Sequence, residues 1–176
     1  MPAQRLVLGP YAPDAVREQC SDSSAAATLE VNEPAPSDAR LLNVSNRGFC
    51  GSGDEVLIAG FVVSSEGATT LLVRAVGPTL ETVGGLTGVL PDPQLTIYRH
   101  EENGADTPLL SNDDWGTGAD ASTTATVSAQ VGAFALPAGS NDAALVVTLP
   151  PGIYTVVASG VGDATGTALV EVYEAP

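Results

Sequence analysis

Three apolar runs near the end of the chain most constrain what it can fold into. Rich in Val and Ala, they occupy residues 143–150 (AALVVTLP), 152–161 (GIYTVVASGV) and 166–175 (GTALVEVYEA). Only tight turns built from Pro, Gly and Asp separate them. In the last run Leu169, Glu171 and Tyr173 would share one face, because side chains alternate along a strand. Such runs joined by such short turns predict neighbouring antiparallel strands.

The chain upstream repeats this pattern at the regular spacing of an all-β fold. The further predicted strands are residues 41–45, 55–63, 69–77, 93–100 and 108–111. The run at 55–63 (EVLIAGFVV) is apolar throughout and predicts a central strand buried on both faces. Residues 77–91, rich in Gly and Pro, predict a loop. Residues 120–131 are the one helical candidate, with Asp120 as its cap.

Charge and residue types exclude several functions. The 176 residues carry a formal net charge of -15, and all six basic residues are arginines. An acidic surface repels nucleic-acid phosphates, so we expect no nucleic-acid partner. Without lysine no Schiff base can form, and one histidine, His100, does not predict a zinc site or a catalytic triad. Adjacent carboxylates such as Glu101 and Glu102 point to opposite faces of a strand, so we expect no glycosidase pair and no enzyme.

The length suits one β domain, residues 41–176, preceded by an N-terminal arm, residues 1–40. Two short apolar runs interrupt the polar arm. An isolated strand cannot satisfy its own backbone donors and acceptors. The arm is therefore a linker or packs along its own domain, or its strands add to a neighbouring copy. The residues predicted to form these assembly strands are Arg5, Leu6, Val7, Leu8, Ala27, Leu29 and Val31.

Targeting signals are sparse. No run approaches the roughly 20 apolar residues of a membrane span, so membrane insertion is not expected. The first residues lack the long apolar run of a signal peptide. Either a leader lies outside this numbering or the chain is a piece of something larger.

Cys20 and Cys50 are the only cysteines, and their spacing fits no metal motif. A disulfide that ties the arm to the domain is the first interpretation, and two free thiols are the alternative. Arg74 lies within an apolar strand. Because a buried guanidinium is costly unless it is paired, Arg74 predicts a structural ion pair, with Asp92 or Asp114 as its partner.

Asn112, Asp113 and Asp114 form the best candidate metal cluster, and Asp92 can join them from the preceding loop. Hard oxygen ligands suit Ca²⁺, so calcium is the one cofactor considered. The alternative is turn architecture, because Asn and Asp side chains also bond their own backbone. Trp115, which follows directly, either stacks on a sugar or closes the end of the hydrophobic core.

With these residues in view, the region from about residue 41 to residue 176 resembles β-sandwich domains repeated in large secreted bacterial proteins, similar to pre-peptidase C-terminal domains. The matching pieces are VLIAGFVV, LLVRAVGPTL, DPQLTIY, LLSNDDWG, LPPGIYTVVASG and GTALVEVY. The resemblance implies a jelly-roll-like β-sandwich of about eight strands. It also implies a non-catalytic role and an extracellular or cell-surface setting. Some relatives in the pre-peptidase group bind calcium or polymers.

Two functions remain open from the sequence. The first is a structural or assembly module that links to itself or to other surface proteins, with the arm completing a neighbour's sheet. A head-to-tail contact of this kind does not close, so it would propagate into a fibre or surface layer. The alternative is a module that binds a carbohydrate or another surface polymer with the help of calcium.

Overall fold

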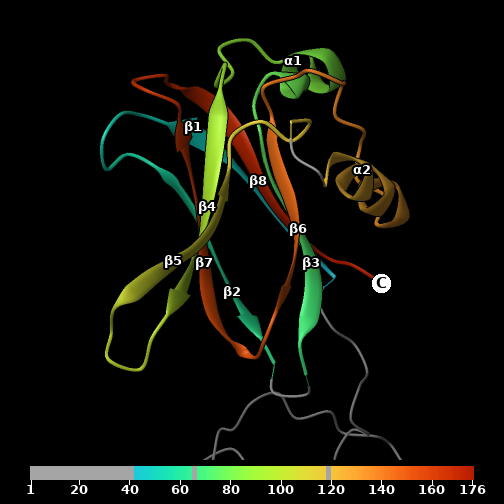
Figure 1. Cartoon of the computed structure of the whole chain (residues 1–176). Coiled ribbons are helices and arrows are strands. Elements are labelled where there is room, and N and C mark those ends of the chain that lie inside the picture. The colour runs from blue at the N-terminus through green and yellow to red at the C-terminus, as the bar shows by residue number, and fades with distance from the viewer. Residues whose placement is uncertain (1–41, 65–66, 118–119) are drawn as a thin grey trace, which may run out of the picture. The chain divides into compact units, whose positions relative to one another are not determined.

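The computed structural model describes residues 42–64, 67–117 and 120–176. The predicted arm, with Cys20 and both of its apolar runs, lies outside these residues. The described chain forms eight strands and two short helices (Figure 1). The strands are β1 (Asn43–Cys50), β2 (Leu57–Val63), β3 (Thr69–Val76), β4 (Pro93–His100), β5 (Asp106–Asn112), β6 (Ala143–Leu149), β7 (Gly152–Gly160) and β8 (Gly166–Glu174). The helices are α1 (Thr79–Gly84) and α2 (Ala121–Gln130).

The strands form two four-stranded antiparallel sheets. Sheet A has the order β1-β8-β3-β6, and sheet B has the order β2-β7-β4-β5. The first strand pairs with the eighth, the second with the seventh, the third with the sixth and the fourth with the fifth. This nesting is that of a jelly roll, in which one long hairpin is rolled into two packed sheets. The predicted all-β, jelly-roll-like sandwich of about eight strands is therefore confirmed.

Alternation along the strands explains why they bury one face. In β7, Tyr154, Val156 and Ala158 are fully buried, and the residues between them are partly exposed. Their neighbours across the ladder, such as Ala59 on β2 and Ile97 on β4, are buried in the same layer. The hydrophobic core lies between the two sheets and consists almost wholly of aliphatic side chains, as the low aromatic content requires.

Sheet A carries a further layer on its outer face. In β3, Leu71, Val73 and Ala75 face the core, while Leu72, Arg74 and Val76 face outward and are equally buried. Helix α2 contacts β3 and β6, and the segment after it, residues 133–136, packs against the same strands. The central strand buried on both faces is therefore β3.

The structure corrects three predictions. The run at 55–63 is not a central strand: β2 is the edge strand of sheet B, and its outward residues Ile58 and Val62 are 54% and 70% exposed. The first strand continues to Cys50, through residues predicted as a turn. The predicted loop at 77–91 contains helix α1, which ends where Gly85 adopts a φ of 63°. The second helix forms where it was predicted, although the Asp120 side chain makes no capping hydrogen bond.

Candidate interaction groove

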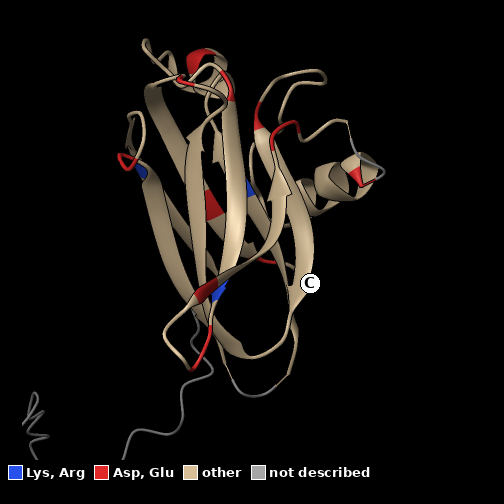
Figure 2. Ribbon diagram, turned by 60° about the vertical axis from the view of Figure 1, so that its left-hand side comes forward, with Lys and Arg blue, Asp and Glu red and all other residues tan. Residues whose placement is uncertain are grey.

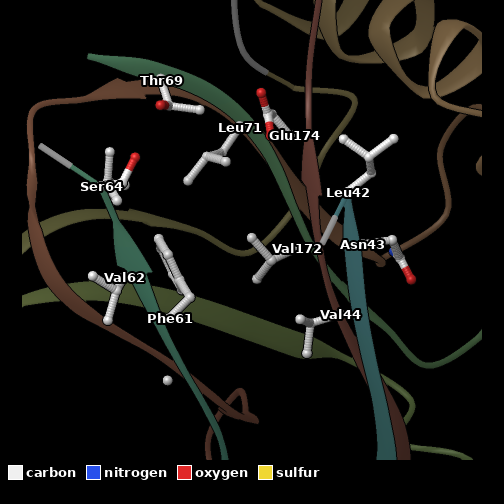
Figure 3. A pocket seen from close by; sticks show the side chains of 12 residues that line it. Leu42, Asn43, Val44, Phe61, Val62, Ser64, Thr69, Leu71, Val172 and Glu174 are labelled. Carbon is white, nitrogen blue, oxygen red and sulfur yellow. The ribbon is translucent and has the colours of Figure 1, made fainter. Parts of the chain in front are cut away.

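An apolar groove opens along one side of the sandwich, between the edge strands β1 and β2. At one end these strands are in contact, because a Cβ on Gly48 would lie 2.8 Å from Leu57 Cδ1. Toward the other end they separate and leave a groove of about 380 Å³ (Figure 3). We call this side, from Gly48 and Leu57 at its closed end to Leu42 and Ser64 at its mouth, the open seam.

The interior of the open seam is hydrophobic core that β1 and β2 fail to cover. Figure 3 shows Val44 of β1 and Phe61 of β2 projecting into the same space, with Leu71 and Val172 behind them. Leu71 and Val172 belong to the central core. The Phe61 ring stacks on the buried ring of Tyr154, with a centroid distance of 5.6 Å. The groove therefore offers apolar contacts and few polar partners.

Strand β2, beside the groove, lacks the features that usually keep an edge strand from pairing with another chain. Exposed edge strands usually carry charges, prolines or bulges that prevent this. Strand β2 has the sequence LIAGFVV and carries none of these. The other edge of the same sheet, β5, contains Asp106 and Pro108, and its register against β4 shifts at Ile97. Figure 2 shows that most acidic residues lie in loops, and β2 itself contains no charged residue.

The opposite side of the sandwich, between β5 and β6, is tied together by hydrogen bonds. The Ala144 backbone N–H donates to Asn112 Oδ1 at 2.9 Å, and the Trp115 N–H donates to the carbonyl of Asp142 at 2.9 Å. The buried Asp142 carboxylate accepts from the backbone N–H groups of Gly77 (2.8 Å) and Thr79 (3.3 Å) and from the Thr79 hydroxyl. We call this side the closed seam. Sequence reasoning missed Asp142, which looked like one more turn residue.

The predicted metal residues lie at this closed seam. Desolvation raises the pKa of Asp92, and the charges of Asp114 and Asp113 add to this effect. Within the residues that the structure describes, however, no group of three or more His, Cys, Asp or Glu side chains is placed to hold a metal ion. Asn112 is engaged by the Ala144 N–H and itself donates to the carbonyl of Asp114. These contacts are those of turn architecture, the alternative that the sequence left open.

Trp115 closes the end of the core beside this turn. It packs against the cluster formed by Val76, Leu80 and Leu136. Its indole N–H donates to the carbonyl of Pro137 and to the Ser140 hydroxyl, at 3.2 and 3.1 Å. These contacts make Trp115 part of the hydrophobic core.

Arg74 forms the predicted ion pair, but with another partner. Its Nη2 lies 3.1 Å from Glu171 Oε2, and both side chains are buried. This contact lacks hydrogen-bond geometry, whereas Nη1 donates to the carbonyl of Phe134 at 2.7 Å and the guanidinium lies 4.3 Å from the centre of the Phe134 ring. The predicted partners Asp92 and Asp114 were wrong because Glu171 lies directly opposite Arg74 in the β3–β8 register.

The electrostatics of this pair follow from its burial. Desolvation lowers the pKa of Arg74, and Glu171 opposes that effect. Glu171 Oε1 accepts hydrogen bonds from the Tyr173 hydroxyl at 2.8 Å and from the Ser45 hydroxyl at 3.3 Å. Desolvation, followed by the hydrogen bond to Glu171, raises the pKa of Tyr173 to about 12. The network lies on the outer face of sheet A.

Within the residues that the structure describes, Cys50 is a free, fully buried thiol at the closed end of the open seam. Its Sγ donates to the carbonyl of Ala158 at 3.6 Å, and it packs with Leu90 and Ala168. Burial raises the pKa of the thiol. Cys20 lies outside the described residues, so the pairing of Cys20 with Cys50 stays a prediction. A bridge would require Cys20 to enter this buried site.

Comparisons with known proteins bear on the fold alone. No protein-family profile and no curated protein sequence matches the chain. The structure is similar to the crystal structure of the pre-peptidase C-terminal domain of a collagenase from Bacillus anthracis, with 16% sequence identity and a TM-score of 0.41. The match covers 74% of this chain and 89% of that domain. That domain belongs to the group that the sequence motifs resemble, and a match at this level transfers no residue role. In the described residues no helix is long and apolar enough to cross a membrane.

Proposed function

We propose that this chain is a non-catalytic, extracellular assembly module, in which the N-terminal arm of one copy joins the sandwich of the next. The single observation that supports it most is the open seam, an apolar groove beside an unguarded edge strand. Exposed apolar surface next to free backbone donors and acceptors is the acceptor chemistry of strand addition. The extracellular setting rests on the resemblance of the sequence motifs to domains of secreted bacterial proteins.

Leu42 lies at the mouth of the groove and is 55% exposed. Its carbonyl accepts a hydrogen bond from the Glu174 N–H at 2.9 Å, which ties the start of the described domain to the end of β8. Addition of one copy's arm to the next copy's groove is a heterologous contact, and such a contact can propagate without closing.

The test compares the intact chain with a chain that lacks residues 1–40. Light scattering after gel filtration measures the mass of each as concentration rises, and circular dichroism checks that both keep the β fold. We expect the intact chain to form a concentration-dependent series of larger particles and the truncated chain to remain monomeric.

A full-length variant provides the matched control. Leu29→Asp keeps the length of the arm but places a charge in its apolar run, and it should also prevent growth. Thr28→Asp, one position away, should have a weaker effect, because the neighbouring residue faces the other side of a strand. If the intact chain stays monomeric at every concentration, assembly is wrong and the alternative of a polymer-binding module gains support.

A further inference from the structure

We propose that the open seam accepts residues Ala25–Val31 of a second copy, which add as a new strand to the free edge of β2. In this arrangement Ala27, Leu29 and Val31 face the groove, and Thr28 and Glu30 face solvent. This arrangement rests on the proposed function: β2 of one copy is the acceptor, and residues 25–31 of a second copy are the donor.

The free edge of β2 has the dimensions that the donor needs. Strand β2 has seven residues and pairs with β7 alone; its other edge contacts β1 near Leu57 and is open toward Val63. A strand of that length spans about 23 Å. Residues 25–31 (AAATLEV) are an uninterrupted run without Pro or Gly, and they match this length. Addition of this run would pair the backbone groups of β2 that its own sheet leaves free.

The groove also fits the side chains of the donor. Val44, Phe61, Leu71 and Val172 form its apolar part, and the polar lining residues are Asn43, Ser64, Thr69 and Glu174. In residues 25–31 small and branched apolar side chains alternate with Thr28 and Glu30. A strand with this alternation can present one apolar face, and only that face can enter the groove without burying a charge. In an addition that runs parallel to β2, residue 30 lies level with Val62, so the Glu30 carboxylate is on the outer face of sheet B beside that exposed side chain.

The connecting residues favour a second copy over the chain's own groove. Residues 32–41 (NEPAPSDARL) link the donor run to Leu42 and reach at most roughly 35 Å when extended. Pro34 and Pro36 fix their own φ angles and bias the residue before each toward extended conformations. Proline-rich linkers act as semi-rigid spacers, which favours reach to a second copy.

Crosslinking between two distinguishable copies tests this arrangement. One copy carries Glu30→Cys and the other carries Val62→Cys, both full length and in a Cys20→Ser background. The buried Cys50 thiol stays unreactive in the folded chain. A short bismaleimide joins directly opposed and diagonal cross-strand neighbours, which lie within about 8 Å. The matched control is Leu110→Cys on β5, which is also half-exposed but lies on the other edge of sheet B.

We expect the Glu30→Cys and Val62→Cys copies to form a mixed covalent dimer in several-fold higher yield than the Glu30→Cys and Leu110→Cys copies. Equal yields, with the intact chain still assembling by light scattering, would overturn β2 as the acceptor and leave the proposed function standing. The last sample is a single chain that carries both Glu30→Cys and Val62→Cys. If its product has the mass of a single chain at all dilutions, the occupant is the chain's own arm and the second copy is excluded. An intact chain that neither assembles nor crosslinks overturns both proposals.

Discussion

The two seams of the sandwich are built from the same sheets but differ in how the sheets are joined. At the closed seam, hydrogen bonds of Asn112 and Trp115 connect the end of β5 to the start of β6, and the Asp142 carboxylate holds that start to the end of β3 and to α1. At the open seam, β1 and β2 meet only near Gly48 and Leu57 and leave a groove of about 380 Å³. The buried polar groups described above are bonded at the closed seam and on the covered face of sheet A. The open seam is the side that we propose receives a partner.

The largest effect is expected from breaking the closed seam. Asp142→Ala leaves the N–H groups of Gly77 and Thr79 and the Thr79 hydroxyl without their charged acceptor. We expect the free energy of unfolding, measured by urea denaturation, to fall by about 3–4 kcal/mol. Asn112→Ala removes one neutral acceptor and should cost only about 1–2 kcal/mol. A loss of under about 1 kcal/mol for Asp142→Ala would mean that the seam is held by packing instead.

A matched pair of enlargements contrasts the packing of the two seams. Ala143 is fully buried at the start of β6, so Ala143→Val should overpack the core and cost about 1–3 kcal/mol. Val44 is half-buried at the groove, so Val44→Ile has room and should change stability by no more than about 0.8 kcal/mol, in the stabilising direction. Thermal unfolding of both variants beside the parent chain measures the difference. Similar losses at both positions would show that the groove is filled in solution.

A smaller effect is expected at high pH, on the β1–β8 flank of the open seam. The folded pKa of Tyr173, about 12, lies above the unfolded value of 10.0 because burial and Glu171 favour the phenol. This contribution to stability is fully present below about pH 10 and is lost as the pH rises toward about 12. Urea denaturation at several pH values between these limits should show a steeper loss for the parent chain than for Tyr173→Phe. Identical pH profiles would exclude Tyr173 as the titrating group.

The smallest effect concerns Cys50, at the closed end of the open seam. If its thiol is free, as in the structure, addition of a reductant should leave the melting temperature unchanged. A thiol reagent should label Cys50 only after unfolding, because the Sγ atom is buried. The opposite result, a reductant-sensitive melt with no reactive thiol in denaturant, would establish the bridge to Cys20. That bridge would stabilise the chain by roughly 3–4 kcal/mol.

The sequence predicted the strands in which apolar and polar residues alternate. It did not predict which strand lies at a sheet edge, because that depends on the neighbouring strands. Strand β4 and the last three strands follow directly from alternating side chains and their turns. The run at 55–63 was assigned to the sheet centre because its apolar residues do not reveal that Ile58 and Val62 lack a covering layer. That information lies in the order of the strands, which depends on contacts distant in the sequence.

The candidate site shows the same limit. Glu171 stood in an apolar strand as Arg74 did, so pairing these two misplaced charges was a usable signal. No sequence pattern indicated the groove, because a cavity between two edge strands depends on how far the two sheets separate. The role of Asp142 could not be predicted either, because its hydrogen-bond donors lie at α1 and the end of β3, far away in the sequence.

The chain enters and leaves the sandwich at the same end, and this has a mechanical consequence. Asn43 pairs with Tyr173, and the Glu174 N–H bonds the Leu42 carbonyl. A pulling force between residues 42 and 176 would peel β8 from β1 one hydrogen bond after another, which resists tension poorly. A force that enters through Leu42 and leaves through a strand docked on β2 would bypass this ladder. In a thread built by strand donation, the tensile strength would then depend on the docked strand, while each sandwich stays relaxed.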